Sequence, residues 1–126
     1  MLVLVDSSVW IQYFKSGEGV EKLDSLIDRD VIVTNKIILA ELVPFLKIKK
    51  QNKLVTLFQS LRETELNINW DEIIEIQYKC LKAGINGIGI PDLIIAQNAF
   101  QNKCKLYTLD RHFNLLQKVL GIELFS

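Results

Sequence analysis

The sequence opens with MLVLVDSSVWI, residues 1–11, in which an apolar run gives way to one acid and two serines. The run Met1–Val5 is continuous rather than alternating, which is typical of a strand covered on both faces in a parallel sheet. Asp6, Ser7 and Ser8 then offer side chains that cap a helix beginning near Val9. A buried strand that leads directly into a helix predicts an α/β fold, with Asp6 at the carboxyl end of the first strand.

Strand-like and helix-like segments alternate along the rest of the chain. Further strands are expected at Val31–Val33, Lys105–Thr108 and Ile122–Leu124, and residues 64–68 alternate as another strand would. The spacing of apolar residues predicts helices at residues 20–29, 36–49, 53–62, 70–83, 91–102 and a short one that ends near 119. This alternation predicts one domain, residues 1–126, with helices around a central, mostly parallel sheet of about four to five strands.

Local signals refine these helices. Asn35 and Asn69 precede two of them as capping residues. Pro44 lies inside the helix 36–49, where it is expected to kink the helix, and Pro91 suits the first position of the helix 91–102. Four apolar residues of the helix 70–83 are expected to face the core, namely Ile73, Ile74, Ile76 and Leu81.

Composition places the chain among soluble globular proteins, since 49% of its residues are hydrophobic and 24% are charged. Its 15 basic and 15 acidic residues cancel, which argues against sequence-blind nucleic-acid binding but leaves room for a local basic patch. Cys80 and Cys104 match no zinc spacing and are expected to be buried free thiols. No apolar run approaches the ~18 residues of a membrane span and no signal-like segment opens the chain, so we expect a cytoplasmic protein.

Four acids stand beside or within apolar segments. Asp6 and Asp110 follow strands, and Asp92 opens a helix. Glu41 has apolar neighbours at helical spacing, so its side chain is expected to point at the sheet and not at water. Carboxylates are rarely buried unless they are paired or bind a metal, and the carboxyl ends of parallel strands share one edge. The four acids therefore predict one shared site for Mg²⁺ or Mn²⁺.

Such a site suits phosphodiester hydrolysis. Without a cation the carboxylates would repel one another, whereas one or two cations would neutralise them and activate water. Taken singly, three of the acids have an ordinary explanation: Asp6 as a helix cap, Asp92 as a first-turn acid and Asp110 as a turn residue. Glu41 has none, because its apolar surroundings offer it no partner.

Four segments also carry a resemblance to a known family: Leu4–Ile11, Ile38–Leu42, Gly89–Ala96 and Leu106–Phe113. In this order and at these separations they resemble the PIN-domain nucleases, especially the VapC-type toxins of toxin–antitoxin pairs, over essentially the whole chain. The resemblance implies a three-layer α/β/α PIN-like fold and a metal-dependent endoribonuclease. It also implies that Asp6, Glu41, Asp92 and Asp110 form the acidic quartet, with Asp6 and Asp92 as the most direct ligands.

The resemblance extends to residues beside the quartet. Thr108 matches a small hydroxyl residue that the family often places two before its last acid, although a β-branched residue is equally expected in a strand. Ser7 could lend a hydroxyl to the site or act as a cap. His112 stands where many relatives carry another acid, and a solvated side chain or a proton donor are both compatible with it.

The resemblance further implies partners. An RNA substrate would need positive charge near the site, for which the chain offers Lys47, Lys49, Lys50, Lys53, Lys103, Lys105 and Arg111. An antitoxin would need exposed apolar surface, and a homodimer could use part of the same surface. The region 36–62 holds more apolar residues than one helical face requires: Leu39, Leu42, Val43, Leu46, Leu54, Val55, Leu57, Phe58 and Leu61.

Two other functions remain open. Asp6 could be the nucleophile of a phosphoaspartate-forming phosphatase or receiver-like domain, although such phosphatases usually place a second Asp where this chain has Ser8. The chain could also be a non-catalytic metal- and protein-binding module on the same fold.

Overall fold

Four short strands form a central sheet whose pairs are all parallel. In a computed structural model that describes residues 1–126, the strands are β1 (Val3–Val5), β2 (Ile32–Val33), β3 (Lys105–Tyr107) and β4 (Glu123–Leu124). Their order in the sheet is β2-β1-β3-β4, so β1 lies in the interior. All three residues of β1 are buried, as its continuous apolar run predicts. The predicted α/β fold with a parallel sheet is confirmed.

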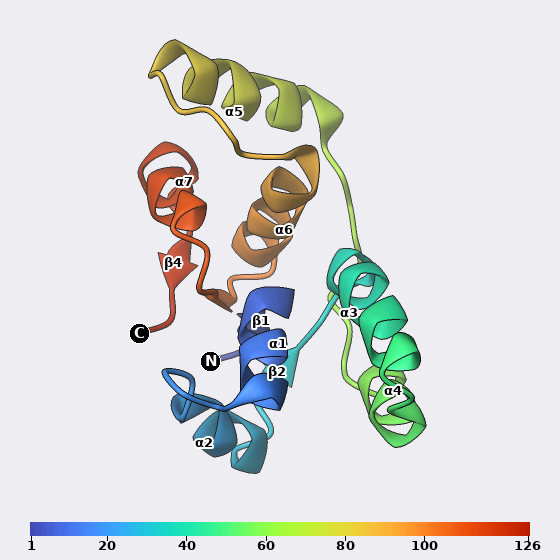
Figure 1. The fold of residues 1–126 in the computed structure, drawn as a ribbon. Helices are drawn as coiled ribbons and strands as arrows, with labels where there is room; N and C mark the ends of the chain where they lie inside the picture. Colours follow the sequence, from blue (N-terminus) through green and yellow to red (C-terminus); the bar gives the residue numbers. More distant parts are fainter.

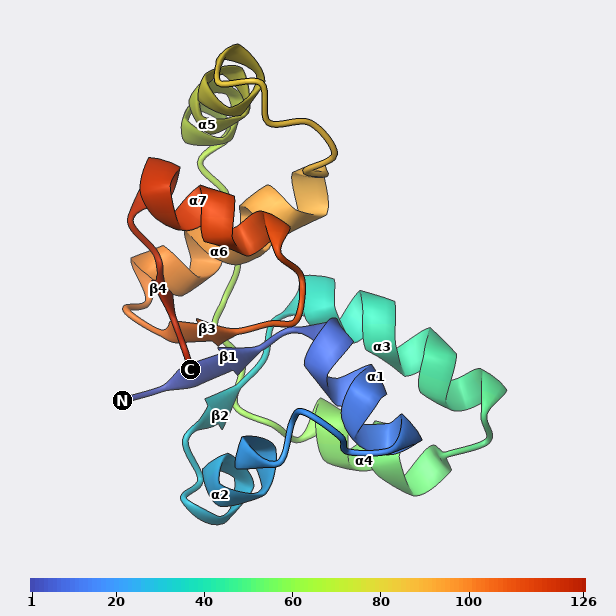
Figure 2. The same ribbon diagram turned by 60° about the vertical axis from the view of Figure 1, so that its left-hand side comes forward.

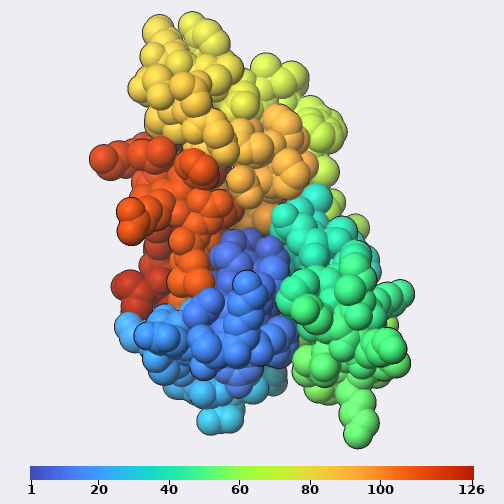
Figure 3. Space-filling view, viewed as in Figure 1, coloured from blue at the N-terminus to red at the C-terminus, as the bar shows by residue number.

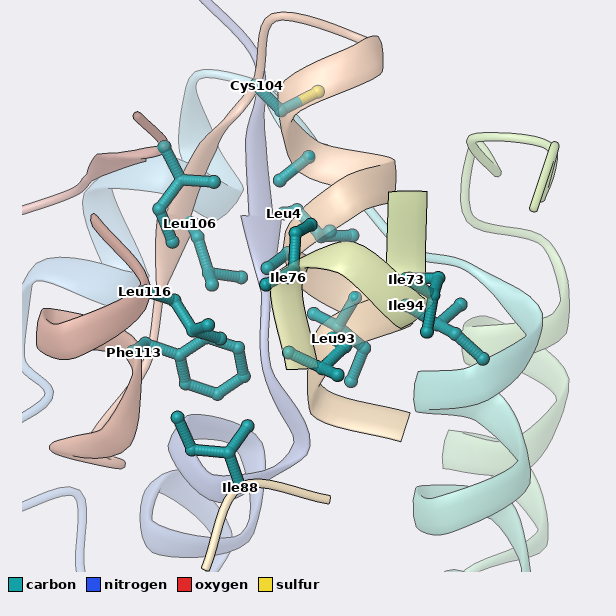
Figure 4. Packing of buried hydrophobic residues seen from close by; sticks show 14 of the residues in the cluster. Leu4, Ile73, Ile76, Ile88, Leu93, Ile94, Cys104, Leu106, Phe113 and Leu116 are labelled. Carbon is teal, nitrogen blue, oxygen red and sulfur yellow. The ribbon is translucent and has the colours of Figure 1, made fainter. Parts of the chain in front are cut away.

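Seven helices surround the sheet (Figures 1 and 2), namely α1 (Ser7–Lys15), α2 (Lys22–Asp28), α3 (Lys36–Ile48), α4 (Asn52–Gln59), α5 (Trp70–Lys82), α6 (Ile90–Gln101) and α7 (His112–Leu120). Alternate side chains of β1 enter two separate cores. Leu4 packs in a cluster with residues of α5, α6 and α7, whereas Val3 and Val5 pack with residues of α1, α2 and α4. Figure 4 shows the first cluster, in which Leu4 and Leu106 of the sheet lie beside Leu93 of α6 and Phe113 of α7.

Predicted helix ends are confirmed where a local side chain defines them. Asn35 Oδ1 accepts a hydrogen bond from the Ile38 amide at 2.9 Å, and Asn69 Oδ1 accepts one from the Glu72 amide at 3.1 Å. Helix α3 continues past Pro44 to Ile48. Cys80 and Cys104 are buried free thiols, as expected. None of the helices has the length and hydrophobicity to cross a membrane.

The strand predicted at residues 64–68 is absent. Only an isolated bridge between Thr34 and Glu63 forms there. The reason is that side chains of α6, rather than a neighbouring strand, satisfy this backbone: Asn98 Nδ2 donates to the Glu65 carbonyl and Gln101 Nε2 to the Asn67 carbonyl. The alternation seen in the sequence arises because Leu66 and Ile68 still pack against the core.

The prediction that four apolar residues of α5 face the core is wrong for two of them. Ile73 and Ile76 are buried, but Ile74 is 65% exposed and Leu81 56% exposed. Helix α5 lies at the end of the molecule (Figure 1) and packs chiefly against α6 and α7, so only one of its faces is covered.

Buried Asn98 connects α6 to two other segments. Its Oδ1 accepts hydrogen bonds from Asn35 Nδ2 at 3.0 Å and from Thr64 Oγ1, while its Nδ2 donates to the Glu65 carbonyl. Replacing Asn98 by Ala is expected to reduce the free energy of unfolding by about 2–4 kcal/mol, since it leaves buried polar partners unsatisfied. Urea denaturation measures this loss.

Gln101→Ala is the matched control, because that exposed side chain makes one hydrogen bond, to the Asn67 carbonyl. Its cost is expected to stay below about 1 kcal/mol. Equal losses for the two variants would contradict the role given to Asn98.

Candidate active site

Asp6 lies at the carboxyl end of β1, where its amide extends the ladder by donating to the Tyr107 carbonyl at 2.8 Å. It occupies the N-cap position of α1, yet its side chain makes no capping hydrogen bond. Instead Oδ2 accepts hydrogen bonds from Ser8 Oγ at 2.7 Å and Thr108 Oγ1 at 3.0 Å. The carboxylate is therefore held in place by two hydroxyls, and its other oxygen is left without a protein donor.

Thr108 connects Asp6 with the segment that carries Asp110. Its Oγ1 donates to Asp6 and accepts from the Asp110 amide at 3.0 Å. Asp110 Oδ1 in turn accepts from the His112 amide at 2.9 Å and lies 3.0 Å from His112 Nδ1. The carboxyl ends of the neighbouring strands β1 and β3 thus bring two of the predicted acids and Thr108 together, as parallel pairing requires.

Glu41 lies on α3 but is exposed, so the prediction that it points at the sheet is wrong. The buried stripe of α3 runs through Ile38, Leu42 and Leu46, and Glu41 lies at the border of this stripe. Its Oε1 accepts a hydrogen bond from Ser7 Oγ at 3.3 Å, which ties it to the first turn of α1. Glu41 is therefore a rim residue that faces the start of α1.

Asp92 lies in the first turn of α6 and is half-buried. Burial raises the pKa of its carboxyl group above the ordinary 3.8, and the charges of Asp110 and Asp6 raise this pKa further. Burial also raises the pKa of Glu41 above 4.5, even though the residue as a whole is exposed, and the charges of Asp6 and Asp92 add to this effect. Each acid of the quartet thus lies close enough to another to repel it.

No lysine or arginine neutralises this cluster. The only ion pairs in the protein join Lys36 to Glu63 and His112 to Asp110. Carboxylate oxygens without a cationic partner are the donor set that Mg²⁺ and Mn²⁺ prefer. The residues present therefore fit a divalent cation in charge and chemistry. Their spacing is more open than a formed site, because no three Asp, Glu, His or Cys side chains converge at ligand distance.

The sequence interpretation treated Ser8 only as a helix cap. Its hydroxyl donates to Asp6 and accepts from the Leu109 amide at 3.1 Å, so it links β1 to the turn after β3. The serine two residues after the acid at the end of a strand was the available signal, since a hydroxyl at that spacing can reach back to the carboxylate.

Fold and site together define a class: a small parallel α/β domain whose unneutralised carboxylates gather at the carboxyl edge of the sheet. A sequence model of the PIN domain matches residues 3–119, and the chain belongs to this family. Among curated proteins no relative matches it.

Several solved structures share the fold. VapBC2 from Rickettsia felis, bound to a DNA fragment from its promoter, is 20% identical with a TM-score of 0.75 over 99% of this chain and 98% of that one. FitAcB from Neisseria gonorrhoeae is 23% identical with a TM-score of 0.72 over 99% and 97%. VapC20 from Mycobacterium tuberculosis, a toxin that cleaves the sarcin–ricin loop, is 14% identical with a TM-score of 0.62 over 90% and 94%.

The raised pKa values of Glu41 and Asp92 predict how stability depends on pH. The folded protein binds protons at these carboxyls more tightly than the unfolded chain, so the free energy of unfolding falls as pH rises from about 4 towards 7. Thermal melts in chelator are expected to give a lower Tm at pH 7 than near pH 5. Asp92→Asn should flatten this dependence and raise the Tm at pH 7.

Asp71→Asn provides the control, since Asp71 is an exposed first-turn acid of α5, outside the cluster. Its pH dependence should match the wild type. A wild-type Tm that rises from pH 5 to pH 7 in chelator would contradict repulsion within the cluster.

Proposed function

We propose that this PIN-domain protein is a divalent-metal-dependent endoribonuclease and the toxin of a type II toxin–antitoxin pair. The observation that carries the proposal is the gathering of Asp6, Glu41, Asp92 and Asp110 at one rim, where burial and mutual repulsion raise the pKa values of two of them and no lysine or arginine compensates. An acidic rim of this kind repels RNA unless a cation binds there first.

Asp6, Glu41, Asp92 and Asp110 would hold Mg²⁺ or Mn²⁺. The cation would acidify a bound water and stabilise negative charge on the scissile phosphate. The chain's own contribution is position: Ser8 and Thr108 fix one oxygen of Asp6, and Ser7 restrains Glu41. In-line attack of water on phosphorus would release the 3′-hydroxyl and leave a 5′-phosphate.

Room for the substrate exists beside the acids. A pocket of about 360 Å³ borders Thr108 and Asp110 and offers polar side chains from α7 and the residues before it, namely Arg111, Asn114 and Gln117. A guanidinium here can position the phosphate backbone of a strand without reading its sequence. Arg111 is therefore better placed than Lys47, Lys49, Lys50 and Lys53, which lie around the turn between α3 and α4, away from the sheet (Figure 2).

A separate groove suits the antitoxin. A hollow of about 400 Å³ lies between α1, α2 and α4, with Trp10, Phe14, Leu54 and Leu57 among its apolar lining. Leu57 is 60% exposed, so an apolar side chain of a partner segment could bury it in this hollow. Structures of similar fold that are VapBC complexes support a cognate antitoxin as that partner.

Two other functions, a phosphoaspartate-forming phosphatase or receiver-like domain and a non-catalytic binding module, lack a supporting feature at the site. Ser8, at the position where a phosphatase would place its second Asp, is fully engaged with Asp6 and Leu109. A non-catalytic module differs from the proposal in one measurable respect, because it would bind the cation without cleaving RNA.

Asp6→Asn and Asp92→Asn are each expected to reduce Mn²⁺-dependent RNA cleavage by at least ~100-fold, since each removes a charge that would hold the cation. Incubation of total RNA with the purified chain, followed by mapping of 5′-phosphate ends, measures this. Chelator should stop the wild type, and Asp71→Asn should cleave normally. Cleavage that survives chelator and both substitutions would remove the proposal, and Mn²⁺ binding without any cleavage would favour the non-catalytic module.

The hydroxyl of Thr108 is expected to matter through Asp6. Thr108→Val removes the donor to Asp6 and the acceptor for the Asp110 amide, and should lower cleavage roughly tenfold. Thr108→Ser keeps the hydroxyl and should stay within about threefold of wild type. Single-turnover cleavage measures the change in activity, and the rise in Tm on adding Mn²⁺ measures the change in metal binding. Equal activity of the Val and Ser variants would show that Thr108 is only a strand residue.

A further inference from the structure

His112, the only histidine of the chain, lies between two acids of the rim. Its Nδ1 lies 3.0 Å from Asp110 Oδ1, and its backbone amide donates to the same oxygen at 2.9 Å. Burial and the charge of Asp110 raise the pKa of Asp92, and a positive charge on His112 opposes this rise. The imidazole is therefore in contact with Asp110 and close enough to Asp92 to act on it electrostatically.

The other ring nitrogen of His112 faces the loop between α5 and α6. A Cβ placed on Gly87 of this loop would lie 3.4 Å from His112 Nε2 and 3.7 Å from His112 Cε1, so the ring packs directly on the backbone. Gly87 has a φ angle of +87°, which glycine adopts without a steric penalty. Figure 3 shows the segment between α5 and α6 lying against α7. Glycine at this position thus permits both the turn of the backbone and the approach of the ring.

The same loop leads directly to Asp92. Ile88 is 5% exposed and packs in the first core cluster, where Figure 4 shows it beside Phe113 of α7. Gly89 is the N-cap residue of α6, and its amide lowers the pKa of Asp92 against the stronger effect of burial. An acid in the first turn that interacts with the N-cap amide has its position tied to that of the cap. Three consecutive residues, Gly87 to Gly89, therefore connect His112 with Asp92.

We propose that His112 is a positioning residue, which holds the turn that carries Asp110 and the loop that precedes Asp92 at a fixed separation. This role rests on the proposed metal site and adds to it a residue that need not touch the cation. The amide and ring of His112 engage Oδ1 of Asp110 and leave Oδ2 free, just as Ser8 and Thr108 engage only Oδ2 of Asp6. Groups that orient metal-binding side chains in this way strongly affect metal affinity.

The positions of the two ring nitrogens distinguish this role from the two that the sequence left open for His112. Nδ1 lies against Asp110 and Nε2 against Gly87, so both nitrogens are directed at protein atoms. A proton donor would need one of them directed at the reacting atoms, and a merely solvated side chain would have both in water. The ring instead fills the space between two segments that each carry an acid.

Calorimetric titration of the full chain with Mn²⁺ tests this role without any measurement of cleavage. His112→Ala loses both contacts of the ring and should bind Mn²⁺ at least ~10-fold more weakly than the wild type. His112→Asn keeps an N–H donor near the place of Nδ1 and should bind at least about threefold more tightly than His112→Ala. Lys118→Ala is the control, since Lys118 is exposed in the last turn of α7, and its affinity should match the wild type.

The outcomes separate the role of His112 from the metal site itself. A wild type that binds Mn²⁺ and a His112→Ala variant that binds it equally well would overturn the positioning role and leave the proposed function intact. A wild type that binds no Mn²⁺ would overturn both. Equal losses in His112→Ala and Lys118→Ala would show that any change in α7 weakens the site, and would also overturn the role of His112.

The contact with Gly87 has its own test, in which Gly84 serves as the control. The two glycines have φ angles of +87° and +77°, so replacing either by Leu brings similar backbone strain. Only at Gly87 would the new side chain meet His112, because nothing lies within 4 Å of a Cβ at Gly84. Gly87→Leu is expected to weaken Mn²⁺ binding at least ~5-fold, whereas Gly84→Leu should change it by less than about twofold.

Combining Gly87→Leu with His112→Ala completes a double-mutant cycle. If the ring transmits the effect of the loop, Gly87→Leu should change the Mn²⁺ affinity of the His112→Ala variant by less than about twofold. A loss that is the same with and without the ring would mean that the loop acts on Asp92 directly, and would overturn the role of His112.

Discussion

Carboxylates that repel one another occupy one rim of this protein, and no lysine or arginine relieves the repulsion. Burial and neighbouring charge raise the pKa values of Glu41 and Asp92, which means that ionising them at neutral pH costs stability in the metal-free state. The packed cores of the domain have to offset this cost. A divalent cation bound only by the folded state would remove this cost, so metal binding would raise the stability of the domain.

The fold assembles the rim from segments far apart in the sequence. Parallel pairing of β1 with β3 sets Asp6 beside Thr108 and the turn that carries Asp110. Helices α3 and α6, which carry Glu41 and Asp92, are joined where Asn35 donates to Asn98. Since the acids come from the sheet and from helices α3 and α6, the cluster exists only when the whole domain is folded. Loss of buried hydrogen bonds far from the acids, such as those of Asn98, is therefore expected to disturb the cluster.

The sequence predicted those features that local chemistry determines. A buried strand followed by an acid located Asp6 and Asp110, and the asparagine caps located the starts of α3 and α5. The sequence-based prediction failed where contacts between distant segments determine the structure. The direction of the Glu41 side chain depends on which of two adjacent faces of α3 packs against the core, and both faces carry apolar residues. Residues 64–68 alternate like a strand, but side chains of α6 satisfy their backbone. The double role of Ser8 depends on the turn after β3, 101 residues away.

Helix α5 illustrates why an excess of apolar residues is informative. Periodicity assigns an apolar residue to the core on the assumption that a helix packs against one partner, but α5 has apolar residues on two different faces. The surplus face therefore points to a second partner outside the chain. Figures 1 and 2 place α5 at the opposite end of the molecule from α2 and α4, which border the other apolar hollow. A partner on α5 and an antitoxin segment between α1, α2 and α4 would thus not compete for surface.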